Sequence, residues 1–282
     1  MANNLTLRQL SIEDLALLKA SKYNMENLGF AIKAVNSIGS VAETTIKFLP
    51  EKVLSKLQNS TKSVLLGVIK TNLLTIQKHQ TFKKPSKIMY KSIVTGTGVV
   101  SGFFGSSTGL GTAIFLGELT LSTKFLMRTI MDIARSEGED IYSLEGQLAC
   151  LEVFALGGTS KDDDSLETSY YTSRAALNST LQKVTATGVK SVLDGLVASA
   201  SSVGSKAITN FVSKIAARFS ILLSEKFVAQ IVPVVGAATG GTLNYIFVEH
   251  FQKMATAHFT IRRLERHYGA DLVKTAYDGM KV

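Results

Sequence analysis

The chain of 282 residues has one cysteine, three prolines and no tryptophan. A lone cysteine, Cys150, cannot form an internal disulfide, so nothing in the sequence requires an oxidising compartment. The N-terminus also lacks the cationic start and the continuous apolar core of a secretion signal, because Glu13 and Asp14 interrupt it. We therefore expect a cytoplasmic protein. Its mean hydropathy of +0.20 is high for a soluble protein and low for a polytopic membrane protein.

Acidic residues are missing from one long stretch, Lys52 to Gly117, which carries nine lysines and no Asp or Glu. The whole net charge of +9 can be assigned to this stretch. Such a segment suits the anionic face of a membrane, where each surface lysine contributes about 1 kcal/mol. Nucleic acid fits less well, because arginines and interleaved aromatic residues are missing here. A lysine-rich face that is merely solvated is the other interpretation.

Alternating strand patterns are almost absent, and apolar residues recur at helical spacing instead. Examples are the stretches Ser11 to Val35 and Leu49 to His79, the second with Pro50 at its start. The segment from Leu156 to Ser169 is the best candidate for an exposed loop. The sequence therefore predicts an all-α, multi-helix bundle. We divide it into N-terminal amphipathic, lysine-rich helices (1–91) and a helical domain (92–282), packed together as one unit.

Two uncharged segments, Ile93 to Gly117 and Phe227 to Val248, are 25 and 22 residues long. About 20 residues suffice to cross a bilayer. The first segment, however, contains seven glycines, and each costs a helix interior about 1 kcal/mol relative to alanine. Three glycine pairs have the spacing that lets helix backbones approach closely: Gly98/Gly102, Gly105/Gly109 and Gly236/Gly240. We therefore expect glycine-rich apolar helical hairpins, either buried in the bundle or inserted into a bilayer.

Two short patterns imitate a nucleotide-dependent enzyme. Gly96, Gly98 and Gly102 follow an apolar run as in a dinucleotide-binding fingerprint, and Tyr170 and Arg174 have the spacing of a dehydrogenase Tyr-x-x-x-Lys pair. The fingerprint should open a series of alternating strands and helices, which the sequence lacks. Arginine also does not replace the ammonium group of lysine. We therefore predict no catalytic residue and no cofactor.

Metal-ligating patterns are equally weak. The four histidines form no pair at i,i+4, and the run from Asp162 to Asp164 lacks the glycine and the alternation of a calcium loop. Cys150 lies within an apolar helical pattern, which is typical of a small core residue. No metal site is predicted.

Charged residues embedded in apolar helices are more informative. Arg128 and Asp132 stand at i,i+4 and can pair on one helix face, and Arg262 lies near Arg263 and Arg266 on another helix. Buried ionisable groups need partners, so we expect these two helices to meet through a polar network. A purely structural network and a ligand-binding site are both compatible with this pattern.

These two helices resemble the bacterial EcsC family. One hallmark lies in Thr123 to Gly158, where a helix with Arg and Ile-Ala is followed by a Gly-x-Asp turn; the other lies in Ile231 to Gly269, with its glycine-rich turn, Asn-Tyr and Arg-rich helix. Tyr170 to Leu177 is similar to the family's middle helix. The resemblance runs from about Ile93 to the C-terminus.

The resemblance implies a bacterial, largely helical protein whose family is named for a gene beside those of an ABC exporter. It implies no activity that could be carried over. It marks as site or scaffold residues the following positions: Arg128, Asp132, Gly138, Asp140, Asn244, Tyr245, Arg262 and Arg263.

Our leading hypothesis is a non-enzymatic protein at the inner face of the cell membrane, attached peripherally or inserted through its hairpins. Its partner would be anionic lipid or a membrane protein, and a homo-oligomer stays open. The surface-binding residues would be five lysines: Lys78, Lys83, Lys84, Lys87 and Lys91. The alternatives are a pore-forming toxic or defence effector with a concealed hairpin, and a small-ligand-binding or hydrolase-like enzyme built on Arg128, Asp132, Asn244 and Arg262.

Overall fold

The computed structural model describes residues 10–26, 51–77, 109–156, 170–197, 203–231 and 236–281, and every element in these ranges is helical. The predicted all-α bundle is thereby confirmed. The elements are α1 (Ile12–Glu26), α4 (Glu51–Gln77), α6 (Gly109–Ser136), α7 (Leu144–Glu152), the 3-10 turn η1 (Val153–Ala155), α8 (Tyr170–Val197), α9 (Val203–Ile231), α10 (Gly236–Tyr268) and α11 (Ala270–Gly279).

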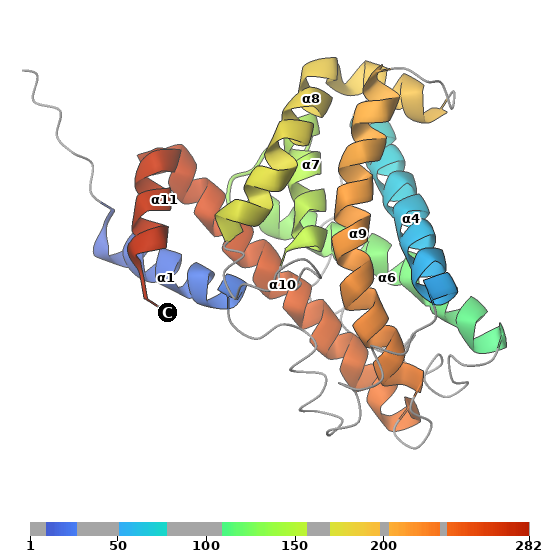
Figure 1. Ribbon diagram of the computed structural model, residues 1–282. Coiled ribbons are helices and arrows are strands. Elements are labelled where there is room, and N and C mark those ends of the chain that lie inside the picture. Colours follow the sequence, from blue (N-terminus) through green and yellow to red (C-terminus); the bar gives the residue numbers. More distant parts are fainter. Residues whose placement is uncertain are drawn as a thin grey trace, which may run out of the picture.

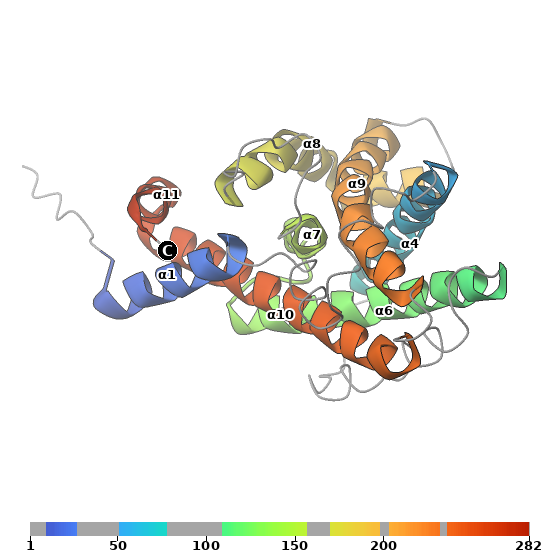
Figure 2. The same cartoon turned by 60° about the horizontal axis from the view of Figure 1, so that its bottom comes forward.

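The helices form two groups around a short central one. One group is formed by α4, α8 and α9, which pack against one another (Figure 1). In the other group α10 packs on α1 and α11 near its C-terminal end and on α6 along its length. Within the first group α8 is bent at Gly188, where φ is +76°. The central helix, α7, lies among α6, α8, α9 and α10 (Figure 2). α7 therefore contacts helices of both groups, which also meet directly where α9 packs on α10 and α4 packs on α6.

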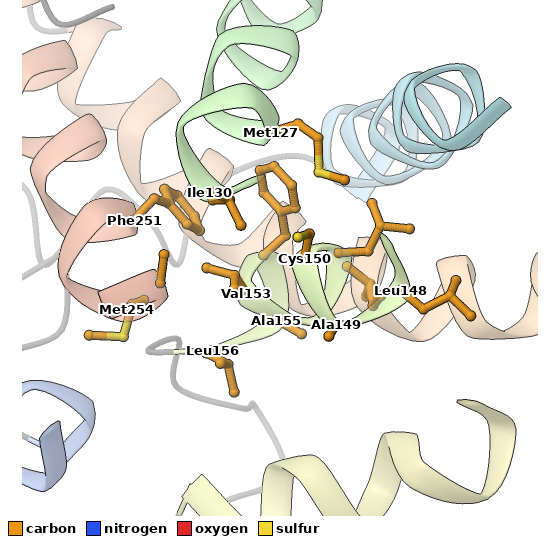
Figure 3. Close-up of a cluster of buried hydrophobic side chains, with 14 of the residues drawn as sticks. Met127, Ile130, Leu148, Ala149, Cys150, Val153, Ala155, Leu156, Phe251 and Met254 are labelled. Carbon is orange, nitrogen blue, oxygen red and sulfur yellow. The ribbon is translucent and has the colours of Figure 1, made fainter. Parts of the chain in front are cut away.

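α7 is buried on all its sides rather than along one stripe. Every residue from Gly146 to Leu156 is buried, including Cys150, which confirms the predicted core role of that cysteine. Figure 3 shows the surrounding side chains, with Met127 of α6 above α7 and Phe251 of α10 to its left. A helix that is covered all round is expected to be apolar all round. Two residues of α7 depart from this rule, because Gln147 and Glu152 are polar and fully buried.

A glycine turn joins α6 to α7. Gly138 has φ of +76°, and the amides of Gly138 and Glu139 bond to the carbonyls of Arg135 and Ala134. This is the Schellman arrangement, which ends helices at a glycine because the left-handed conformation costs glycine little. The turn continues into the N-cap of α7, where Ser143 Oγ accepts a bond from the amide of Gly146. The Gly-x-Asp turn seen in the sequence is therefore a helix stop followed by a helix start.

The N-terminal helix is tied to the C-terminal one. The buried ammonium group of Lys22 donates to the carbonyl oxygens of Tyr277 and Met280 at the end of α11, both at 2.8 Å. A cation is favourable there because the last carbonyls of a helix carry partial negative charge. Leu18 and Leu65 also belong to the same buried cluster as α7. The described N-terminal helices thus share one core with the rest of the chain.

The second uncharged segment spans the junction between two helices. α9 ends at Ile231 and α10 begins at Gly236, so Phe227 to Val248 is divided between them, with Gly236 and Gly240 in the first turns of α10. In the described ranges, no helix combines the length and the hydropathy that a bilayer-spanning segment needs. Gly109 begins α6, whereas Gly98, Gly102 and Gly105 fall outside the described residues.

Candidate functional site

Three long acid-free stretches come together in the group formed by α4, α8 and α9. The stretches 52–77, 170–193 and 203–224 hold ten lysines and arginines and no Asp or Glu. The sequence alone singles out the first stretch, which is part of the long acid-free segment from Lys52 to Gly117. The other two are shorter and distant in sequence, so only the fold shows that they lie beside it. Since the three helices pack on one another, this side of the molecule (Figure 1) collects positive charge.

Several of these basic side chains reach solvent. Lys56 of α4, Lys183 of α8, and Lys206 and Lys214 of α9 are exposed, and Arg218 is half-buried. Lys206, Lys214 and Arg218 recur at multiples of four residues, so they lie along one face of α9. We call these five residues the basic face. The predicted lysines Lys78, Lys83, Lys84, Lys87 and Lys91 follow α4 in sequence but lie outside the described residues.

A second feature is an arginine–glutamate network where α10 passes the end of α6. Arg262 donates two hydrogen bonds to the carboxylate of Glu139, from Nε to Oε2 at 3.1 Å and from Nη2 to Oε1 at 2.6 Å. Arg263 Nε bonds to Glu137 Oε2 at 2.8 Å, and Arg266 pairs with Glu139 and with the carbonyl of Glu137. The predicted meeting of the two segments through charges is therefore observed, with partners in the Gly138 turn.

Charge and burial compete at Glu139. Burial raises the pKa of this carboxyl, but the hydrogen bonds and positive charges of Arg262 and Arg266 outweigh burial and hold the pKa below its usual 4.5. On the rim, Tyr268 donates to Asp14 of α1 at 2.7 Å, and this bond is the main cause of the lowered pKa of Asp14. The network joins side chains of α1, of the turn after α6 and of α10. It therefore stabilises the junction of these three elements.

The structure separates the other predicted site residues. Arg128 is exposed on α6, and the ion pair of Asp132 is with Arg135 at 3.1 Å rather than with Arg128. Asp140 acts as a turn residue, because its Oδ1 accepts from the amide of Tyr142. The pairing expected from i,i+4 spacing on α6 is thus replaced by one at i,i+3.

Asn244 and Tyr245 also lie away from the arginines. Asn244 is buried and Tyr245 is exposed in the first half of α10. Eighteen residues of continuous helix separate Asn244 from Arg262, which corresponds to about 27 Å. The structure therefore does not assemble Arg128, Asp132, Asn244 and Arg262 into one site. In the part of the chain it describes, no three His, Cys, Asp or Glu side chains gather as metal ligands either.

A third feature is a buried chain of titratable side chains between α7, α8 and α10. Tyr170 Oη lies 3.0 Å from Nδ1 of His258, and His258 Nε2 lies 3.7 Å from Oε2 of Glu152. At the other end Arg174 donates to Tyr170 Oη at 3.3 Å and to both oxygens of Glu265 at 2.8 and 2.7 Å. We call Glu152, His258, Tyr170, Arg174 and Glu265 the buried chain.

The direction of these bonds follows from Arg174, which can only donate. If Tyr170 Oη accepts from Arg174, its own hydrogen is available for Nδ1 of His258. The ring hydrogen of His258 is then on Nε2, the atom that faces Glu152. This order of carboxylate, imidazole and hydroxyl is that of an acid–base triad. Glu152, His258 and Tyr170 are at most 3 % exposed, however, so no substrate reaches them in this conformation.

Sequence reasoning missed most of the buried chain. Tyr170 and Arg174 have the spacing of a dehydrogenase Tyr-x-x-x-Lys pair. On a helix this i,i+4 spacing places both side chains on the same side of α8. Glu152 and His258 are 106 positions apart, so no local pattern joins them. The available signal was a glutamate at the end of an otherwise apolar stretch, since a buried carboxyl calls for a partner.

Comparison with known proteins identifies a family. The sequence matches the model of the EcsC protein family over residues 14–264. This match takes in α1 and α4, which precede the limit of the resemblance seen in the sequence, and it crosses the predicted boundary between residues 91 and 92. No curated protein and no solved structure matches the chain.

Proposed function

The chain belongs to the EcsC protein family, and from its charge distribution we propose that it is a non-enzymatic protein that binds anionic membrane surfaces peripherally through its basic face. The single observation that carries the proposal is the convergence of three acid-free stretches on one side of the bundle. Lipid is the chosen partner because lysine outnumbers arginine there, whereas nucleic-acid surfaces are typically rich in arginine and aromatic side chains.

The physical basis is electrostatic attraction to lipid headgroups. Each lysine or arginine near an anionic surface contributes about 1 kcal/mol, and the attraction decays within a Debye length of about 10 Å at 0.1 M salt. Three or four residues of the basic face touching lipid would therefore supply about 3–4 kcal/mol. The lysine-rich segment after α4 carries five more lysines and no acid, so it adds to the same attraction if it approaches the same surface.

Charge reversal tests this proposal. The double variant Lys56→Glu/Lys206→Glu changes two exposed residues on adjacent helices of the basic face. Its binding to vesicles containing anionic lipid should be at least tenfold weaker, measured by co-sedimentation at low salt. The matched control Lys19→Glu/Lys281→Glu changes the net charge equally at two exposed residues, one on α1 and one just after α11. These helices lie on the side of the molecule away from α4 and α9 (Figure 1). Equal loss in both variants would mean that net charge alone, and not the basic face, governs binding.

Vesicle leakage separates this proposal from the pore-forming alternative. A protein that only binds headgroups leaves a trapped dye inside the vesicles, whereas a released apolar hairpin lets the dye escape. We expect binding without leakage. Leakage that depends on Gly236 and Gly240 would favour the pore-forming effector instead.

A further inference from the structure

The junction between α8 and α10 is made largely by polar side chains. Tyr170, Tyr171 and Arg174 extend from the start of α8, and Tyr171 Oη donates to Glu265 at 3.0 Å beside the Arg174 bonds. Their partners, His258 and Glu265, lie on α10. These side-chain bonds connect α8, in the helix group that carries the basic face, with α10 (Figure 1).

Glu152 and His258 stand at the inner end of this junction. Their side chains are 1 % and 0 % exposed, and the separation of 3.7 Å is longer than a hydrogen bond. Among the described residues, both oxygens of Glu152 and Nε2 of His258 have no hydrogen-bond partner. A buried ionised carboxylate without such bonds costs several kcal/mol, which makes its neutral form the favourable one.

The surroundings act on the two groups in opposite directions. Burial raises the pKa of Glu152 to about 7, although the charges of Arg174 and Arg262 lower it. Burial, together with the same two arginines, lowers the pKa of His258 well below its usual 6.5. The facing titratable groups are Tyr170 and Arg174 of α8, Arg262 and Glu265 of α10, Glu145 of α7 and Tyr277 of α11. Among the described residues, α4, α6 and α9 add apolar side chains to this core, such as Leu65, Met127 and Phe219.

We propose that the folded protein keeps Glu152 protonated and His258 as the neutral imidazole. The pair then binds one titratable proton, on Glu152, and the fold disfavours a second one on His258. We call this arrangement the one-proton lock. The neutral carboxyl and the neutral imidazole then lie side by side in the core without a net charge. Tyr170 stays anchored on Nδ1 of His258, and Arg174 stays on Tyr170 and Glu265. The lock is independent of whether the basic face binds lipid.

The consequence for stability follows from proton linkage. Because its pKa is raised in the fold, Glu152 alone stabilises the folded state fully below pH 4.5, and this contribution is lost as the pH rises to about 7. Because its pKa is lowered, His258 alone contributes above pH 6.5, and its contribution is lost as the pH falls below 6.5. Each effect changes the folding equilibrium about tenfold per pH unit, so the two cancel between pH 4.5 and 6.5.

Single substitutions should break this cancellation with opposite signs. We would measure the unfolding equilibrium of the full chain in urea from pH 4.5 to 6.5 for E152Q and H258N, in which amide side chains keep polar groups at both positions. As the pH is lowered, the folding constant of E152Q relative to wild type should fall about tenfold per unit, and that of H258N should rise about tenfold per unit. Glu249→Gln, at an exposed pair with Lys253, is the control and should stay flat.

The proposal is overturned if either variant follows the wild-type profile within threefold across this range. If a variant does not fold, infrared spectroscopy of the wild-type protein tests whether Glu152 is protonated. The lock requires the absorption of a solvent-shielded protonated carboxyl group that is present at pH 6 and disappears around pH 7. A spectrum that lacks this absorption at pH 6 contradicts the lock.

Discussion

Arg262 and Arg263, two successive residues of α10, bind the two glutamates that flank Gly138 at the end of α6. The two pairs differ in burial. Arg262 and Glu139 are 9 % and 8 % exposed, whereas Arg263 is 40 % exposed. Since a desolvated bidentate pair is strong and leaves an expensive charge behind when one partner is removed, Arg262 is the residue of this network on which stability depends most.

Replacing Arg262 with alanine should lower the free energy of unfolding by about 3 kcal/mol, because Glu139 stays buried while Arg266 compensates only in part. Arg135→Ala is the control, since it removes an ion pair on α6 whose arginine is 34 % exposed, and it should cost less than about 1 kcal/mol. Urea unfolding at pH 7 measures both. Equal losses for the two variants would show that the Arg262–Glu139 pair is no stronger than a surface pair.

At the residue scale the sequence predicts which residues carry charge in an apolar setting, but not how they pair. Arg262 and Arg263 could be singled out because neighbouring arginines on an apolar helix need partners. Their partners, Glu139 and Glu137, lie more than 120 positions earlier, and only the path of the chain brings them close. Arg128 and Asp132 had ideal helical spacing, yet Asp132 pairs with Arg135. The buried Glu152 and His258 have no local signature at all.

At the scale of elements, α7 owes its position to close backbone packing at its first turn. Gly146 follows the Ser143 N-cap, and a Cβ atom on Gly146 would lie 2.0 Å from the carbonyl oxygen of Asp140. No side chain fits at that distance unless the backbone moves. The turn after α6 and the start of α7 therefore approach each other closely at this glycine. The position of α7 in turn determines where Glu152, its last residue, lies.

Two glycine-to-alanine substitutions should have opposite effects. Gly146→Ala should destabilise the fold by about 3 kcal/mol through overpacking against the Asp140 carbonyl. Gly117→Ala lies inside α6, is exposed and has nothing within 4 Å of an added Cβ, so it should stabilise by about 1 kcal/mol through helix propensity. Thermal unfolding of both variants checks the pair. Stabilisation by Gly146→Ala would refute the close approach of α7 to the turn.

The elements themselves were largely predictable. Apolar spacing indicated helices at Ser11 to Val35 and Leu49 to His79, and α1 and α4 lie within these ranges. The Gly138 turn was visible as a motif, although its Schellman geometry was not. The glycine spacing at Gly236 and Gly240 did not reveal which neighbour these residues approach. Periodicity describes one helix at a time, so it predicted the helices better than their partners.

At the scale of the whole molecule, basic residues without neighbouring acids in sequence gather on one group of helices, whereas α10 carries the arginine–glutamate network described above. The basic face belongs to α4, α8 and α9. The described ion pairs of Glu137 and Glu139 are with arginines of α10, and that of Glu265, itself on α10, is with Arg174 of α8. Such an uneven field orients a protein toward an anionic surface from a distance. The sequence showed the excess charge, but only the fold shows that three separate stretches contribute to it.

Flotation of the wild-type protein with vesicles is the most direct test of peripheral binding to anionic membranes. The protein would be mixed with vesicles with or without anionic lipid, at low and at high salt, and then washed with carbonate. We predict flotation only with anionic lipid at low salt, and release by salt or carbonate, because screening weakens surface attraction. Absence of flotation with anionic vesicles at low salt, or flotation that survives both salt and carbonate, would contradict the account.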